Sequence, residues 1–392
     1  MNFEVLYSAA HAEFPDSEPL GGGKAVADYL IREWRKSEPF ALTVLSPRSL
    51  ECLELPKPLA ELSELQYARF CRQFEKAATD KILMRDPHRC VVLSNDISEG
   101  PKFAALGQRG YKIVTIFQVD VVEYFTRFYL RDRVRPETVA RFRWFRLMPE
   151  VLRLVFEKQY ECVRHSARIV VPSAPMREMI LRCYPRCAAD KIVVMPWGDV
   201  STHSPAGSKP LNVGDDEIVL ITLSRLSPEK GIERLLAALP HVDAHARKLR
   251  VFICGAAAYM KGRAYEQKLR RLAAKVTTPR VEFTGHVTGG HKAALLQRAD
   301  IFVSPSKHES YGLTIAEALA AGCRVVSHHH YGAEGTVVDC SDPKALAATI
   351  SAMIADGRTK KTGEGTPRSQ AAEQLAALLA TTMEAPVPSA RR

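Results

Sequence analysis

The feature that most constrains the fold is an alternation of short apolar segments with longer amphipathic ones. In the first half of the chain, the apolar segments predict strands at 3–7, 41–45, 90–93, 112–117, 168–172 and 192–195. The amphipathic segments between them predict helices at 23–34, 59–78, 102–107 and 135–165. Short apolar strands separated by helices are typical of a parallel sheet that is covered on both faces.

The second half repeats the alternation, so a chain of 392 residues is expected to form two doubly wound α/β domains. Its predicted strands are 218–223, 249–254, 281–283, 301–303 and 324–327, and its predicted helices include 232–239 and 265–274. We predict one domain over 1–200, a polar and proline-bearing linker over 201–210, and a second domain over 211–356. The remainder, 357–392, is expected to be a mobile segment with one short helix. Two such domains facing one another leave a cleft, where a ligand is expected to bind.

Composition limits the compartment. No apolar run approaches the roughly 20 residues that cross a bilayer, and the start of the chain lacks the charged and apolar regions of a secretory signal. The nine cysteines form no CxxC pair, so neither a zinc ribbon nor a disulfide framework is predicted. We expect a cytoplasmic protein.

Basic charge is concentrated in one stretch. The formal net charge is +11, and residues 126–168 contain eleven Lys and Arg against five Asp and Glu. Within it, 141–146 alternates arginine with aromatic residues, as a segment that contacts an anionic membrane surface does. A helix with inward aromatics and solvated arginines is an alternative interpretation. No nucleic-acid-binding motif accompanies the charge, so nucleic acid is not an expected partner.

Two glutamates flank a predicted helix start. Glu309 follows the predicted strand 301–303, and Glu317 lies eight residues later, on a helix that begins near Gly312 or Leu313. Backbone N–H groups at a helix start bind anions. Carboxylates on either side of such a start suit a ligand that is part phosphate and part polyhydroxyl, such as a sugar nucleotide. A capped helix with two unrelated acids is the alternative.

Two cations follow another predicted strand. Arg225 comes directly after 218–223, Lys230 follows five residues later, and Gly231 leads into a helix. Fixed positive charges at the carboxyl end of a strand can stabilise a diphosphate leaving group. Solvated cations in a turn are the simpler alternative.

Together these motifs resemble the retaining glycosyltransferases of family 4, also described as glycosyl transferases group 1. The resemblance rests on 224–231, 283–287 and the Glu309–Glu317 block, and it is dense over about 218–343. It implies the α/β GT-B fold, in which two Rossmann-like domains face each other across a cleft. It also implies catalysis that needs no metal, with Arg225 and Lys230 on the donor diphosphate and Glu309 facing the hydroxyls of the donor sugar.

The resemblance implies further contacts with the donor. Backbone amides near Gly312, Leu313 and Thr314 would bind phosphate oxygens, and Glu317 would bind the ribose. The remaining residues implied on the donor side are Gly22, Gly23, Gly255, Gly285 and Gln118. The resemblance leads us to expect a histidine in place of Gln118, which can hydrogen-bond but cannot become cationic.

The acceptor side is expected in the first domain, where Asn95, Asp96 and Glu99 follow the predicted strand 90–93. Turn and capping roles would also explain these residues. The three adjacent histidines at 328–330 point in different directions and do not predict a metal site.

We therefore predict a retaining, hexosyltransferase-type enzyme without a cofactor. It would move a sugar from a nucleotide-diphosphate sugar to a hydroxyl of a glycan or lipid-linked glycan, in contact with the inner membrane face. The alternative is a catalytically impaired nucleotide- or glycan-binding protein on the same fold. A dinucleotide-dependent epimerase or dehydrogenase would need GxGxxG after the first strand and Tyr-x-x-x-Lys, and the sequence has neither.

Overall fold

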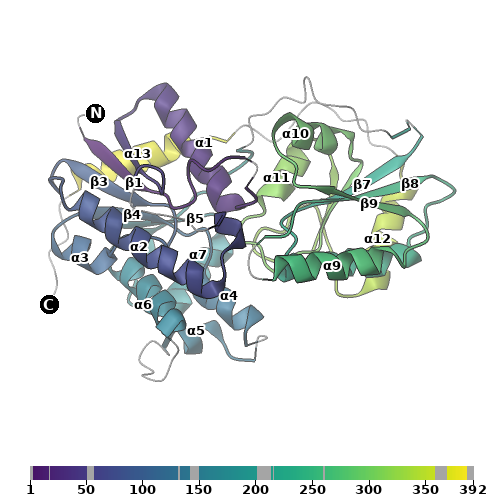
Figure 1. Ribbon diagram of the computed structural model, residues 1–392, viewed down its shortest axis with the longest axis horizontal. Coiled ribbons are helices and arrows are strands. Elements are labelled where there is room, and N and C mark those ends of the chain that lie inside the picture. Colours follow the sequence, from purple (N-terminus) through teal and green to yellow (C-terminus); the bar gives the residue numbers. More distant parts are fainter. Residues whose placement is uncertain are drawn as a thin grey trace. The chain divides into compact units, whose positions relative to one another are not determined.

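A computed structural model describes residues 3–16, 18–50, 57–130, 133–141, 150–200, 213–214, 216–258, 261–357 and 369–385. The chain divides into two compact units. The first comprises Met1–Phe14, Gly22–Trp197 and Gln370–Arg392, and the second comprises Pro15–Gly21 and Gly198–Ser369. Each unit contains one six-stranded parallel sheet with helices on both faces, as the alternation predicts (Figure 1).

The sheet of the first unit has the strand order β2-β1-β3-β4-β5-β6. Its strands are β1 (Glu4–Ser8), β2 (Ala41–Leu45), β3 (Cys90–Ser94), β4 (Lys112–Ile116), β5 (Arg168–Val171) and β6 (Ile192–Val194). All five residues of β3 are buried, because strands and helices enclose it on every side. In the register of the sheet, Ser8 of β1 lies opposite Ser94 of β3, so the two strands end at the same level.

The helices of the first unit cover both faces of this sheet. They are α1 (Gly22–Ser37), α2 (Glu64–Ile82), α3 (Phe103–Gln108), α4 (Val121–Phe128), α5 (Pro136–Val139), α6 (Glu150–His165), α7 (Ala174–Cys183) and α13 (Ala371–Glu384), with short 3₁₀ turns η1 (Leu59–Glu61) and η3 (Ala189–Lys191). Helix α2 begins with a capping box, in which Ser63 and Gln66 exchange side-chain and backbone hydrogen bonds.

The helix near the end of the chain packs on the first unit. The sequence predicts a mobile segment there, but α13 contacts α1, β3 and β4, and it lies beside α1 in Figure 1. Its apolar face is buried through Leu375 and Leu379, and the Trp34 indole N–H donates to the carbonyl of Ala372 at 2.9 Å. The helix is thus attached to the first unit through partners that are distant in the sequence, such as Trp34, which is 338 residues before Ala372, and Lys112, which is 271 residues before Met383.

The sheet of the second unit has the strand order β12-β11-β10-β7-β8-β9. Its strands are β7 (Ile218–Leu223), β8 (Leu249–Cys254), β9 (Arg280–Gly285), β10 (Ile301–Ser304), β11 (Arg324–Ser327) and β12 (Thr336–Val337). Its helices are α8 (Ile232–Ala238), α9 (Gly262–Ala273), α10 (Gly289–Arg298), α11 (Leu313–Ala320) and α12 (Pro343–Ala355), with 3₁₀ turns η4 (Pro228–Lys230) and η5 (Leu239–His241).

Alternate residues of β7 enter two separate apolar clusters, one on each face of the second sheet. Ile218 and Leu220 pack with α8, α9 and α12, whereas Val219 and Ile221 pack with α10 and α11. Figure 1 shows α9 and α12 on one side of this sheet and α10 and α11 on the other. Both faces of the strand are therefore core, which explains why its sequence is apolar from Ile218 to Ile221.

The two units differ from the predicted domains at one short segment. The short segment Pro15–Gly21 belongs to the second unit, although the sequence places it within the first domain. It does so because its residues contact the second unit, as in the hydrogen bond of 2.9 Å between His286 Nε2 and the carbonyl of Asp16. The predicted linker 201–210 lies outside the described residues. Among those residues, no helix is both long and apolar enough to cross a membrane.

Candidate functional site

A lysine and a glutamate meet at the carboxyl edge of the second sheet. Lys230 ends the turn η4 after β7, and Glu309 follows β10, which is the neighbouring strand. Gly231 links η4 to α8 with φ of 60°, and a Cβ there would lie 2.5 Å from the carbonyl oxygen of Pro305. Glycine therefore allows η4 to pack against the loop after β10. Lys230 Nζ donates to Glu309 Oε1 at 2.6 Å.

This ion pair is largely removed from solvent. The side chains of Lys230 and Glu309 are 12% and 16% exposed. Burial opposes the charged form of Glu309, but the charge and hydrogen bond of Lys230 outweigh it and lower the pKa of Glu309 to about 2. Glu309 is consequently a carboxylate at neutral pH, where it can accept hydrogen bonds only.

Arg225 lies beside a glycine of the segment Pro15–Gly21. Its guanidinium is 3.7 Å from Glu229 Oε1. Gly21 has φ of 89°, and a Cβ on it would lie 3.2 Å from Arg225 Nε. The structure thus holds Arg225 between Glu229 and Gly21, while Lys230 contacts Glu309.

The start of α11 has the predicted geometry. Gly312 precedes the helix with φ of 85°, and the amides of Leu313 and Thr314 fall in its first turn. First-turn amides have no acceptor within their own helix. One turn further, Glu317 is only 6% exposed, and its Oε1 accepts from Lys292 Nζ at 2.6 Å.

Gly255 and Gly285, the two glycines of the second unit that the resemblance implies on the donor side, are neighbours. The N–H of Gly255 donates to the carbonyl of Gly285 at 2.8 Å. Gly255 has φ of 147°, and a Cβ there would meet the carbonyl oxygen of Ser224 at 1.8 Å. Gly255 is therefore required for the close approach of two strand ends. No heavy atom of the described residues lies within 4 Å of a Cβ built on Gly285.

Sequence reasoning missed His330, which follows β11 at the same edge of the sheet. Its ring interacts electrostatically with both Glu309 and Lys230. The available signal was its position just beyond the carboxyl end of a strand, where ligands of parallel sheets bind.

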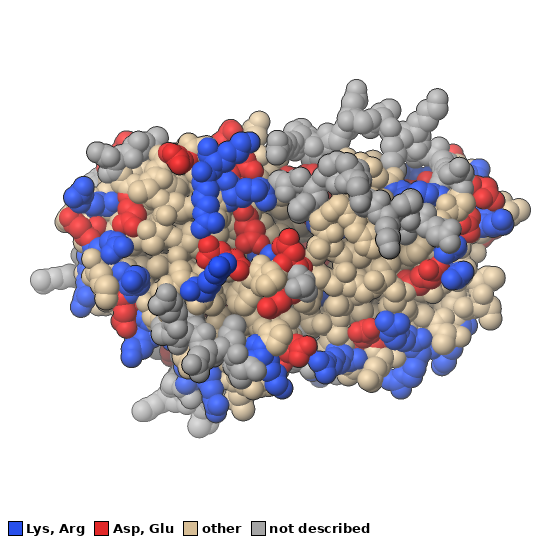
Figure 2. Space-filling view, turned by 45° about the horizontal axis from the view of Figure 1, so that its top comes forward, with Lys and Arg blue, Asp and Glu red and all other residues tan. Residues whose placement is uncertain are grey.

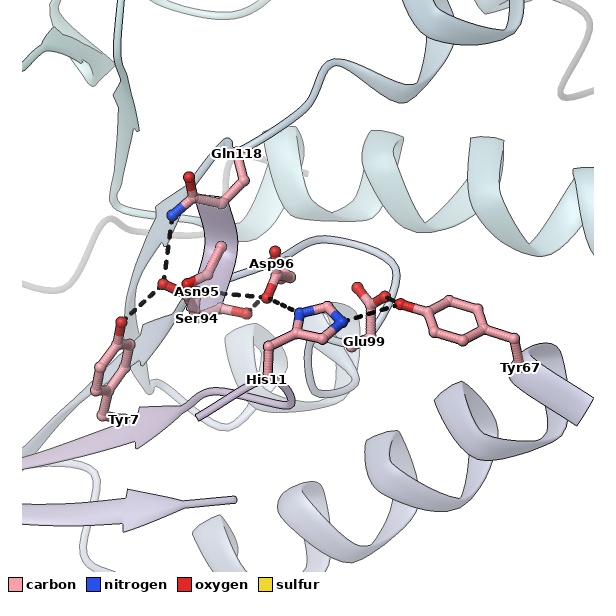
Figure 3. Close-up of polar contacts among 9 residues, drawn as sticks. Tyr7, His11, Tyr67, Ser94, Asn95, Asp96, Glu99 and Gln118 are labelled. Carbon is pink, nitrogen blue, oxygen red and sulfur yellow. Dashed lines mark hydrogen bonds and ion pairs between the residues drawn. The ribbon is translucent and has the colours of Figure 1, made fainter. Parts of the chain in front are cut away.

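In the first unit, a network of polar side chains joins the ends of three adjacent strands (Figure 3). Asn95, after β3, is at its centre. Its Oδ1 accepts from the Tyr7 hydroxyl at 2.7 Å and from Gln118 Nε2 at 3.4 Å. Its Nδ2 donates to the carbonyl of Gly23 at 3.2 Å and to Asp96 Oδ2 at 3.0 Å.

The same network continues through a histidine that sequence reasoning also missed. His11 Nδ1 lies 3.3 Å from Asp96 Oδ2, and its Nε2 lies 3.2 Å from the hydroxyl of Tyr67. The Tyr67 hydroxyl donates in turn to Glu99. These partners are 85 and 56 residues from His11, so no local pattern joins them. The only sequence signal was a histidine three residues after the first strand.

Burial separates the roles of the predicted acceptor residues. Asn95 is 0% exposed and Glu99 is 6% exposed, so both are parts of the fold's interior. Burial, with the nearby charge of Asp96, raises the pKa of Glu99. Asp96 and Gln118 are half-buried and can contact a ligand. Because its nitrogen donates to Asn95, the amide oxygen of Gln118 points away from the network (Figure 3).

Two of the glycines that the resemblance implies on the donor side lie at the start of α1. Gly22 and Gly23 form the first turn of α1 and are not in a loop before it. A Cβ on Gly23 would lie 3.5 Å from Asp96 Oδ1 and 3.8 Å from both Asn95 Nδ2 and His11 Nδ1. Gly23 therefore lets the helix start pack directly on the polar network, and of the three glycines only Gly21 belongs to the second unit.

The basic aromatic stretch is only partly visible. Residues 142–149, which hold most of the alternation, lie outside the described residues. On the face drawn in Figure 2, basic and acidic side chains are interspersed and form no continuous basic surface.

Comparison with known proteins finds a family match in the second half of the chain. Residues 205–366 match the family described as glycosyl transferases group 1. A D-inositol 3-phosphate glycosyltransferase of Geodermatophilus obscurus is 29% identical over 220 residues, which cover 52% of this chain and 48% of that protein. A GDP-mannose-dependent α-(1-6)-phosphatidylinositol dimannoside mannosyltransferase of Mycobacterium tuberculosis is 31% identical over 184 residues, 44% of this chain and 46% of that protein. The chain thus spans less than half the length of these curated relatives.

Solved structures match over nearly the whole chain. Anabaena Alr3699/HepE, whose crystal structure contains UDP and glucose, superposes with a TM-score of 0.59 and 16% identity over 97% of both chains. At this identity the likeness concerns the fold alone. The fold is the predicted GT-B fold, built from two Rossmann-like units.

Proposed function

We propose that the chain is a retaining glycosyltransferase, and the match of residues 205–366 to the family described as glycosyl transferases group 1 supports this proposal. The chain moves a sugar from a nucleotide-diphosphate sugar to a hydroxyl acceptor. The observation that carries the proposal is the contact of 2.6 Å between Lys230 and Glu309, beside the first turn of α11. A cation, a carboxylate and free amides at one strand edge suit a diphosphate that is joined to a sugar.

In the donor half of the reaction, positive groups are already in position around the diphosphate before the bond between sugar and diphosphate breaks. As the bond between sugar and diphosphate lengthens, negative charge grows on the leaving phosphate. Lys230 and Arg225 supply fixed positive charge, and the amides of Leu313 and Thr314 supply dipoles. Because these groups are held in place by the fold, they need little reorganisation as the charge develops. Side chains and amides supply this stabilisation, so the proposed reaction requires no metal and no cofactor.

Glu309 has a different role in this proposal. Its carboxylate accepts hydrogen bonds from hydroxyls of the donor sugar and orients the sugar for transfer. Glu317 accepts from the ribose hydroxyls, and the base lies near Gly255 and Gly285, where the described residues leave the space beside Gly285 open. The anomeric configuration is retained if the acceptor hydroxyl attacks the sugar from the same face from which the leaving group departs. A phosphate oxygen of the donor then takes the proton of the acceptor hydroxyl. We assign no side-chain general base.

The acceptor half is proposed in the first unit. Asp96 presents oxygen atoms that can accept from hydroxyl groups, and its contact with Asn95 holds it within the polar network. A sugar or polyol has such hydroxyls. The relatives named for phosphatidylinositol dimannoside and inositol 3-phosphate suggest an anionic or lipid-linked acceptor. Binding to vesicles that contain anionic lipid, measured by flotation at low salt, tests a membrane contact, and no flotation would remove it from the proposal.

A second function is favoured by one observation. Gln118 cannot carry the positive charge of the histidine that the family resemblance leads us to expect, so the chain is alternatively a sugar-nucleotide or glycan-binding protein that does not turn over. A thermal-shift screen against UDP, GDP, ADP and their sugars identifies the donor, because a ligand of the native state raises the unfolding temperature. Incubation with the stabilising sugar nucleotide then separates the two functions. Slow release of free nucleotide diphosphate supports the enzyme, and binding without release supports the binding protein.

A further inference from the structure

Two loops leave the second sheet side by side. Strands β10 and β11 are parallel neighbours, with Ser304 opposite Ser327. The pairing continues past the strands, because the N–H of His328 donates to the carbonyl of Ser304 at 3.0 Å. Further along, a Cβ on Gly332 would lie 1.8 Å from the carbonyl oxygen of Tyr311. The loop after β11 therefore lies against the loop that carries Glu309, with their backbones in contact.

His330 lies in this second loop and has an unusual environment. Both of its ring nitrogens are buried, and neither has a hydrogen-bond partner among the described residues. A buried polar atom without a partner costs about 1–3 kcal/mol of stability. Most such atoms in proteins are satisfied, so an exception calls for an explanation. His329, the preceding residue, is exposed.

Burial and the nearby charged groups together determine the protonation of His330. Glu309 and Lys230 act on it from the loops after β10 and β7, and His308 and His328 also act on it electrostatically. Burial lowers the pKa of His330 to about 4, since the opposing effect of Glu309 is outweighed by burial and by Lys230. At neutral pH the imidazole is therefore uncharged, with one nitrogen that donates a hydrogen bond and one that accepts.

A ring with one unused donor and one unused acceptor matches a particular class of ligand. Phosphate oxygens can accept from the N–H but cannot donate to the other nitrogen at neutral pH. Hydroxyl groups both donate and accept. In the proposed function, Glu309 accepts hydrogen bonds from the hydroxyls of the donor sugar. Glu309 also interacts electrostatically with the His330 ring.

We propose that His330 binds hydroxyl groups of the transferred sugar through its two ring nitrogens and so favours a sugar nucleotide over the free nucleotide. This proposal rests on the proposed function and extends it, because it assigns a sugar-selecting residue to the loop after β11. The ring lies at the carboxyl edge of three adjacent strands, where Lys230 follows β7 and Glu309 follows β10.

The test is calorimetric titration of three variants with UDP-glucose against UDP and with GDP-mannose against GDP, using the pair that the wild-type protein binds. His330→Leu keeps a side chain of similar size at this position but removes both ring nitrogens. We expect it to weaken binding of the sugar nucleotide about tenfold or more, the effect of roughly 1.4 kcal/mol, and to leave binding of the nucleotide diphosphate unchanged. His330→Asn keeps a donor and an acceptor and should restore part of the loss. His329→Leu, at the exposed neighbour, is the matched control and should alter neither affinity.

Protein stability separates a binding role from a structural one. Because His330 makes no side-chain hydrogen bond within the described part of the chain, His330→Leu should unfold at the same temperature as the wild type or at a higher one. Equal weakening of both ligands would overturn the proposal, and so would no weakening of either. Wild-type protein that binds no nucleotide would overturn the proposed function together with this inference. Binding of the nucleotide by wild type with no effect of His330→Leu would overturn the inference alone.

Discussion

Lys230 Nζ lies 2.6 Å from Glu309 Oε1, although the two residues are 79 positions apart in the sequence. The pair joins the loops after two adjacent strands, and each side chain is less than one-fifth exposed. Glu309 therefore depends on Lys230 to remain charged in a poorly solvated place. In the proposed function, the positive charge of Lys230 binds the diphosphate and the carboxylate of Glu309 binds the sugar hydroxyls. The ion pair allows both charges to be present in one poorly solvated site.

Removing the cation of this pair should impair both chemistry and stability. Lys230→Ala is expected to lower kcat/KM by at least about 30-fold, which corresponds to about 2 kcal/mol of transition-state stabilisation. It also leaves the Glu309 carboxylate buried without its partner, which costs up to about 3–5 kcal/mol of folding free energy. Steady-state kinetics and thermal unfolding measure the two effects.

A double variant distinguishes these two effects. Lys230→Ala combined with Glu309→Gln contains no buried charge at this place, so much of the lost stability should return while turnover stays low. Unchanged turnover in the single variant would exclude Lys230 from leaving-group stabilisation.

Glu309→Gln tests the other side of the pair. The amide keeps the size of the side chain but loses the carboxylate that orients the donor sugar. Affinity for the nucleotide diphosphate should stay nearly intact while turnover falls by a factor of about 10–100. Titration with the nucleotide and kinetics with the sugar nucleotide give the two numbers. A collapse of nucleotide binding would mean that Glu309 does not face the sugar.

The strands and their parallel arrangement were predictable from the sequence because their signal is local. β2, β7, β8 and β11 have the predicted bounds, and they are short apolar runs between helical patterns. The position of α13 was not predictable from such a pattern. A helix of this kind shows that one face is apolar, but it does not show which sheet that face covers, and here the partner Trp34 is 338 residues away.

The candidate site likewise contains some residues that were predictable from local sequence and others that were not. Glu309, Glu317, Arg225 and Lys230 lie within short motifs, so their spacing alone placed them at strand ends and a helix start. His11 and His330 have no motif, because their roles arise from neighbours that the folding of the chain brings to them. Asn95 was predicted at the acceptor side from its loop, whereas its complete burial shows that it supports the residues around it.

Asn95 should therefore matter more for stability than for ligand contact. Asn95→Leu removes four side-chain hydrogen bonds and leaves buried partners such as the Tyr7 hydroxyl unsatisfied. We expect a loss of about 2–4 kcal/mol in the free energy of unfolding, measured by urea denaturation. Gln118→Leu is the control, since it breaks one of these bonds at a half-buried position, and it should cost less than about 1 kcal/mol. Equal losses in the two variants would contradict the central role of Asn95.

Glu317 offers a test of nucleotide recognition. If its carboxylate accepts from ribose hydroxyls, Glu317→Gln should weaken binding of UDP or GDP by about tenfold, or roughly 1.4 kcal/mol. Binding of the corresponding 2′,3′-dideoxynucleotide, which lacks those hydroxyls, should be weak in wild type and unaffected by the variant. Titration calorimetry of the wild type and the variant, each with the nucleotide and with its dideoxy form, measures the coupling between Glu317 and the ribose hydroxyls. An equal loss for both nucleotides would indicate that Glu317 acts through its ion pair with Lys292 and not through the ribose.

The buried imidazole of His330 should make the protein sensitive to acid in a defined range. An unfolded histidine titrates near pH 6.5, whereas the pKa of His330 in the fold is about 4. Between these values the unfolded chain binds a proton that the native protein does not, so the free energy of unfolding falls as the pH is lowered through that window. His330→Leu removes this contribution, and the stability advantage of the variant over wild type should grow as the pH is lowered from about 7 to about 4.5.

Other titrating groups do not obscure this difference. Glu309, whose pKa is lowered to about 2, loses its contribution to stability only below its unfolded value of 4.5. His328, whose pKa is also lowered by burial, titrates in both proteins and cancels in the difference. Urea denaturation of both proteins across this pH range measures the difference, and a difference that does not change with pH would show that the ring is not held neutral in the fold.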